Sequence, residues 1–242
     1  MKIRNISLNF WFKELDFRPQ DKVGELENSL KSILNTHFLY NDMPIRKNIE
    51  IPRIQAKSMD NKYFFTMSLM NCSLSIDVKD EDHDDILLLI NENVQMIYDV
   101  MKEVYDVKII YTSIKINARD THNKLLHEKL TLSNDYEDIS IKKVRKVDDC
   151  YYECIVITST REVNYNIPLV DEKPLESDLY NRSMLISSSE AKIGREYLDV
   201  FYEINDRLKY NLDKDYLTTK ENIRGLVIEV KNFLNKKIDE LI

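Results

Sequence analysis

Residues 70–104 have the sequence MNCSLSIDVKDEDHDDILLLINENVQMIYDVMKEV, and the spacing of the apolar residues changes within this stretch. In its first part every second residue is apolar, as in a strand with one buried face: Met70, Cys72, Leu74, Ile76 and Val78. In its second part apolar residues recur every three or four positions, as in an amphipathic helix: Ile86, Ile90, Val94, Ile97, Met101 and Val104. Asp82 lies between the two patterns and is a favoured helix N-cap. The stretch therefore predicts a strand over 62–78 and then a helix to about residue 105.

The residues on either side extend this pattern. Residues 3–13 alternate between apolar and polar side chains and predict a strand, and Pro19 begins a helix that runs to about residue 36. Residues 49–57 and 107–117 predict two further strands. The order is strand, helix, strand, strand, helix, strand, which is the ferredoxin-like order of an antiparallel sheet with two helices on one face.

The second half of the chain is less regular. Residues 138–147 and 150–160 predict a hairpin that begins a β-meander, and 196–209 predict another strand. Residues 168–189 have no sustained periodicity and predict a long loop. A final helix begins at a capping box formed by Thr218 and Glu221.

The predicted fold class is therefore α+β, with antiparallel sheet or sheets that carry helices on one face. Residues 1–118 form the ferredoxin-like half, and 119–242 form the β-meander, the long loop and the C-terminal helix. These halves are either two domains or one continuous domain. No repeat of long period is visible in the sequence.

Glycine is scarce, and its scarcity excludes several classes of enzyme. The chain has three glycines in 242 residues, and no two of them are close together. Phosphate-binding loops, dinucleotide-binding motifs and nucleophile elbows need glycine where the backbone turns tightly or approaches a ligand. The sequence therefore argues against a P-loop NTPase, a Rossmann oxidoreductase and an α/β-hydrolase, and it favours a protein that is not an enzyme.

Charge and composition limit the possible partners and the location. The net charge of −7 disfavours a nucleic-acid partner, although it permits one. No apolar run is long enough to span a membrane, and the N-terminus is typical of a strand and not of a signal peptide. Three cysteines without metal or redox spacing fit a reducing cytoplasm. Few residues with GC-rich codons are present, which indicates an AT-rich bacterial or phage genome.

Residues 227–231 have the sequence Val-Ile-Glu-Val-Lys, and two predictions compete for them. An apolar strand that ends in Glu-x-Lys is typical of a large nuclease fold, in which the carboxylate binds Mg²⁺ and the lysine polarises the attacking water. Glu229 and Lys231 would then be the catalytic residues. The same residues also continue a helical apolar stripe from Ile223 to Leu241. We favour the helix, with Glu229 and Lys231 on its outer face.

The remaining polar groups do not combine into a metal or cofactor site. The acidic residues within 77–85 lack the spacing and the glycine of an EF-hand loop, and they fit a loop that caps a helix. His122 and His127 would splay around a helix, and Cys150 and Cys154 would be too far apart along a strand to bind one ion. We therefore predict no metal ion and no cofactor.

Tyrosine is abundant in the second half, where it suggests a recognition surface. A phenol combines apolar area with one hydrogen bond, so exposed tyrosines are typical of protein interfaces. The loop 168–189 carries further apolar residues and is expected to lie over the strands as a mobile flap. The predicted partner-binding residues are Tyr151, Tyr152, Tyr165, Leu179, Tyr180 and Met184.

The function expected from these observations is that of a non-enzymatic, cytoplasmic protein-binding protein of a bacterium or phage, with phage–host conflict as a setting. Two alternatives stay open. The element order resembles the architecture of CRISPR repeat-associated RNA-processing proteins, which implies RNA binding or processing by tandem ferredoxin-like halves. Those proteins carry a glycine-rich loop near the C-terminus, and this chain has none there. The second alternative is a metal-dependent nuclease that uses Glu229 and Lys231.

Overall fold

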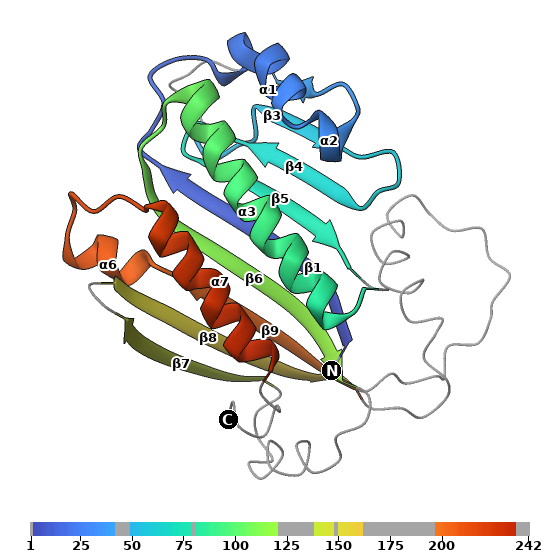
Figure 1. Cartoon of the computed structure of the whole chain (residues 1–242), viewed down its shortest axis with the longest axis vertical. Coiled ribbons are helices and arrows are strands. Elements are labelled where there is room, and N and C mark those ends of the chain that lie inside the picture. The colour runs from blue at the N-terminus through green and yellow to red at the C-terminus, as the bar shows by residue number, and fades with distance from the viewer. Residues whose placement is uncertain are drawn as a thin grey trace, which may run out of the picture.

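The fold is known from a computed structural model, which describes residues 2–41, 49–78, 81–120, 138–147, 150–161 and 197–235. Within these ranges the strands form one nine-stranded sheet, and the long helices lie on one face of it (Figure 1). The strands are β1 (Lys2–Phe12), β2 (Leu39–Tyr40), β3 (Ile54–Lys57), β4 (Tyr63–Met67), β5 (Asn71–Asp77), β6 (Ile109–Asp120), β7 (Asp138–Val147), β8 (Cys150–Arg161) and β9 (Tyr197–Asn205). The helices are η1 (Pro19–Lys22), α1 (Val23–Ser29), α2 (Lys31–Leu34), α3 (His83–Tyr105), α6 (Arg207–Leu212) and α7 (Lys220–Leu234).

Every neighbouring pair of strands is antiparallel, and the spatial order is β2-β3-β4-β5-β1-β6-β9-β8-β7. The prediction of an α+β fold with an antiparallel sheet is thus confirmed. β1 lies near the centre, where Leu8 is opposite Leu74 of β5 on one side and Ile114 of β6 on the other. Both halves of the chain contribute to this sheet, because β6 also pairs with β9.

The order of elements occurs twice along the chain. A central strand (β1) is followed by a three-stranded meander (β3–β5), whose last strand returns to pair with it, and then by a helix (α3). β6, the meander β7–β9 and α7 follow the same order. The two units meet where β1 pairs with β6, so the order of the described strands is symmetrical about that pair except for β2, which has no counterpart. This repeat of elements has no visible counterpart in the sequence.

The helices cover the apolar side of the sheet. The first turn of α3 is capped by Asp82, whose side chain accepts a hydrogen bond from Asp85 N at 2.9 Å, as predicted. α3 and α7 lie side by side (Figure 1) and are joined by the bond from Tyr98 Oη to Thr218 O, 3.2 Å. On α7, the Phe233 ring stacks on Tyr202 of β9 with centroids 3.6 Å apart. None of the helices in the described ranges is both long and apolar enough to cross a membrane.

The other side of the sheet, called the outer face below, points away from α3 and α7. Its centre is polar because the alternate residues of the central strands are serine and asparagine. Ser7 Oγ lies 3.2 Å from Ser73 Oγ across β1 and β5, and Asn9 and Asn117 continue this surface. An antiparallel sheet with one face in water has this pattern.

Four predicted boundaries need correction. The strand expected over 49–57 begins only at Ile54, as β3. The strand expected over 62–78 is two strands, β4 and β5, joined by a turn in which Ser68 Oγ accepts hydrogen bonds from the backbone N–H groups of Met70 and Asn71. The helix expected from Pro19 to 36 is divided into η1, α1 and α2. The strand expected over 196–209 ends at Asn205, where the chain turns into α6.

The cap of the last helix also differs by one position. Thr219, and not Thr218, is the N-cap, and it forms a reciprocal capping box with Asn222. Thr218 is buried and donates a hydrogen bond to Asp206 instead. Its hydroxyl is therefore used in a tertiary contact that the local sequence does not reveal.

Candidate functional site

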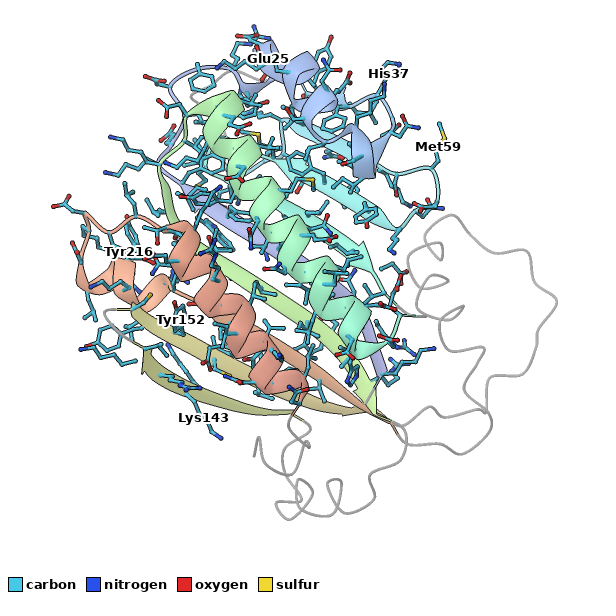
Figure 2. The ribbon with its side chains drawn as sticks, viewed as in Figure 1. Glu25, His37, Met59, Lys143, Tyr152 and Tyr216 are labelled. Carbon is cyan, nitrogen blue, oxygen red and sulfur yellow. The ribbon has the colours of Figure 1, made fainter. Side chains whose placement is uncertain are left out.

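The predicted partner-binding residues do not all lie on one surface. Tyr152 is 4% exposed and lies between β8 and α7 (Figure 2). Its hydroxyl donates to Asn222 O at 3.3 Å, and its ring fills the space left by Gly225, where a Cβ would come 2.1 Å from Tyr152 Oη. Tyr152 is therefore a core residue that joins the sheet to α7, and it is not accessible to a partner in this structure.

Tyr151, the adjacent residue, points to the outer face because side chains alternate along a strand. It is half-buried, and Lys146 Nζ of β7 lies 5.5 Å from the centre of its ring. The other residues predicted to bind a partner lie outside the described ranges: Tyr165, Leu179, Tyr180 and Met184. The predicted flap at 168–189 lies outside them as well.

Further apolar side chains lie on the outer face of β7, β8 and β9. Val144 is 49% exposed, Ile157 39% and Phe201 47%, and Ile157 is directly opposite Phe201 in the β8–β9 pair. Ile155, two residues before Ile157 on β8, is half-buried. We call this surface the meander face: Val144, Tyr151, Ile155, Ile157 and Phe201. Exposed apolar groups that gather on one face mark interaction sites in many proteins, whereas scattered ones need no explanation.

Charged pairs lie among the residues of the meander face, because Lys142 and Glu203 are directly opposite Ile155 and Glu153 is directly opposite Val144. Lys142 Nζ forms an ion pair with Glu153, whose side chain is only 7% exposed. Lys115 Nζ lies 3.6 Å from Glu203 on the neighbouring strands β6 and β9. The meander face therefore combines exposed apolar side chains with paired charges.

The sequence pattern of β9 is sufficient to place Phe201 on the outer face. Val200, Tyr202 and Ile204 are buried on the helix side of β9, so the alternation places Phe201 on the outer face. A large aromatic residue in the polar register of a strand is the feature that could have identified it.

A second group of polar residues lies inside the molecule, at the end of β9. Asp206 is fully buried, and its carboxylate accepts hydrogen bonds from Thr112 N (2.6 Å), Tyr216 Oη (2.6 Å) and Thr218 Oγ1 (2.8 Å). Burial raises the pKa of the Asp206 carboxyl to about 6, and the hydrogen bonds oppose that rise. These bonds join the loop before α7 to β6.

This buried group lacks the features of an active site. Cys150 Sγ lies 3.7 Å from Tyr216 Oη, and burial raises the pKa of the Cys150 thiol, so the thiol stays protonated at neutral pH. The Asp206 carboxylate is saturated by groups of its own chain. The arrangement therefore stabilises the fold, and it does not provide a nucleophile.

The nuclease hypothesis required a strand at residues 227–231, and these residues lie within α7. The helix was predicted correctly, but Glu229 does not lie on its outer face. It is 13% exposed and forms an ion pair with Arg145 of β7, with Arg145 Nη1 2.8 Å from Glu229 Oε1. Among the described residues, no three His, Cys, Asp or Glu side chains come together in a way that could hold a metal ion.

An aromatic cluster lies on the outer face near α6. The Trp11 and Tyr111 rings, from β1 and β6, are stacked with centroids 4.5 Å apart, and the Tyr210 ring is 6.2 Å from that of Tyr111. Arg207 lies over Tyr111 and Lys214 over Tyr210, at 5.6 and 4.1 Å from the ring centres. Stacked rings with cations are also found where proteins bind single-stranded nucleic acid.

Comparison with known proteins adds no family to this geometry. The sequence matches no protein-family model and no curated protein sequence. The function is therefore inferred from the surfaces of this chain alone.

Proposed function

We propose that this chain is a non-enzymatic protein-binding protein that contacts its partner through the meander face. The observation that carries the proposal is that Val144, Ile157 and Phe201 are all exposed on one side of three adjacent strands. Burying such a surface stabilises a complex by about 25 cal/mol for each Å² of apolar area that is removed from water. A partner protein with a complementary apolar surface would supply that cover.

The setting of the proposal is a bacterial or phage cytoplasm, with phage–host conflict as the context. The AT-rich composition and the sparse cysteines support this setting.

We also interpret the first half as ferredoxin-like. The order β4-β5-β1-β6, with α1 and α2 before β4 and α3 between β5 and β6, supports that interpretation.

RNA binding is the second candidate, and the aromatic cluster favours it. Trp11 and Tyr111 lie on the two central strands of an open sheet face, which is where RNA-binding sheets place their stacking residues. Two observations weigh against this candidate. Tyr111 already stacks on Trp11 and lies beneath Arg207, and the whole chain has a charge of −7.

Affinity capture from a bacterial lysate, with and without nuclease, tests the proposal. The wild-type chain is compared with Phe201→Asp and with the matched control Phe64→Asp, which places the same charge on the outer face of the first half, where Phe64 is 40% exposed. We expect a protein partner that survives nuclease, that is lost with Phe201→Asp and that is retained with Phe64→Asp. Capture that nuclease abolishes, or that Phe201→Asp leaves unchanged, would contradict protein binding through the meander face.

A further inference from the structure

We propose that β7 is a strand-addition site for an acidic, extended segment of the partner. The inference rests on the proposed protein-binding function and names the chemistry of the partner. Among the described strands β7 pairs with β8 alone, so the edge of the nine-stranded sheet lies along its other side. An edge strand presents backbone N–H and C=O groups with which an incoming extended peptide can pair.

Apart from its pairing with β8, the central part of β7 is exposed. Residues Lys142 to Lys146 are exposed one after another, which is unlike the alternating burial of β5 or β1. Side chains on both faces of β7 therefore reach solvent, and Figure 2 shows Lys143 projecting beyond the edge of the sheet. A strand covered on either face would bury every second residue.

The same residues concentrate positive charge on an acidic protein. Four of the five residues from Lys142 to Lys146 are basic, whereas the whole chain carries −7. Two of these bases are oriented by nearly buried carboxylates: Lys142 by Glu153 of β8 and Arg145 by Glu229 of α7. This run of four exposed bases along five residues of the edge strand favours an acidic partner.

The sequence of β7 then specifies the peptide that fits it. In an added strand, the residues beside Lys142, Val144 and Lys146 would lie on the outer face, and those beside Lys143 and Arg145 would lie on the helix side. The complementary sequence is acidic, acidic, apolar, acidic, acidic. Its apolar residue would lie next to Val144 and would extend the meander face.

Basic residues on an edge strand also prevent a second copy from pairing there. The two effects are compatible, because charges that repel another β7 attract an acidic strand. If the bases only prevent self-pairing, no peptide should bind this edge, and a binding measurement can show that result.

The test uses a fluorescein-labelled synthetic nonapeptide with the core Glu-Glu-Val-Glu-Glu between Gly-Ser flanks, and binding to the full chain is followed by fluorescence polarisation. We expect saturable binding that Lys142→Glu with Lys146→Glu weakens by about tenfold or more, because attraction becomes repulsion. The charge-matched control, Lys57→Glu with Lys108→Glu, changes two exposed lysines away from β7 and should bind as the wild type does. Absence of binding, or equal loss in the control, would overturn the proposal.

Two further peptides distinguish strand pairing from simple attraction of charge. One is N-methylated at the first, third and fifth core residues, and the other at the second and fourth. Only every second residue of an added strand turns its N–H toward β7, so one methylated peptide should lose binding and the other should keep it. Equal binding of both, or tighter binding of a fifteen-residue oligothymidine, would overturn strand addition. Failure here leaves the Phe201→Asp capture result unaffected, so the two proposals fail separately.

Discussion

The two halves of the molecule share an order of elements but differ in the surfaces that they present. In the first half the outer face of the meander is mainly polar, with Thr66, Ser73 and Ser75 around Phe64, and the edge strand β2 has two residues. In the second half the outer face carries the apolar meander face, and the edge strand β7 has ten residues. The common elements build the core, so the function is best sought where the halves differ.

The largest expected effect on the free energy of unfolding is at the junction between meander and helix, which differs between the two halves. Asp206 is buried beside three donors, whereas Asp82, at the corresponding junction of the first half, caps α3 at the surface. Asp206→Ala should lower the free energy of unfolding by about 3–5 kcal/mol, because three buried donors lose their acceptor. Asp82→Ala should cost about 1 kcal/mol. Chemical denaturation measures both, and equal losses would show that the two junctions are energetically equivalent.

A second prediction concerns whether the halves unfold together. Ile90 on α3 and Leu226 on α7 are both fully buried, and replacing either with alanine should cost about 2–5 kcal/mol by leaving a cavity. Because both halves share one sheet through β1, β6 and β9, each variant should lower the midpoint of a single transition. Calorimetry checks this. Two separate transitions, each sensitive to one variant, would indicate two domains.

The glycines offer a smaller, matched comparison. Gly225→Ala should destabilise the fold by about 1–3 kcal/mol, because the new Cβ would overlap the buried Tyr152 ring. Gly24→Ala, in α1 of the first half, meets nothing within 4 Å and should stabilise the helix by up to about 1 kcal/mol. Thermal melting of the two variants measures the difference. A harmless Gly225→Ala would mean that Tyr152 is not fixed between β8 and α7.

A comparison of the pH dependence of the wild type with that of Asp206→Asn should report on the second half. The pKa of Asp206 is raised to about 6 in the folded state from an ordinary value near 3.8, so the folded state binds the proton more tightly than the unfolded state. The part of the stability that depends on this proton is therefore fully present below about pH 4, and it is lost as the pH rises through about 6, whereas the three hydrogen bonds to the carboxyl group remain. The wild type should lose stability relative to Asp206→Asn over that interval. A constant difference between the two across pH 4 to 7 would contradict the raised pKa.

Local pattern predicted the elements that have one buried and one exposed side. The alternation in β1 and the four-residue spacing in α3 both follow from one buried and one exposed side, and Asp82 was identified as a cap from its position. The β7–β8 hairpin was predicted on the same grounds. Of the two predicted partner-binding tyrosines that lie in the described ranges, Tyr151 is on the outer face and Tyr152 is in the core.

The sequence by itself determined the α+β class, the buried faces of β1 and α3, and the absence of glycine-dependent motifs, because each depends on neighbours along the chain. Only the tertiary structure decided that Tyr152 is buried against Gly225, that Thr218 donates to Asp206, and that Phe201 lies opposite Ile157. These contacts join residues that are distant in sequence or on different strands. Local periodicity records which side of an element is apolar, but it does not record which element covers that side.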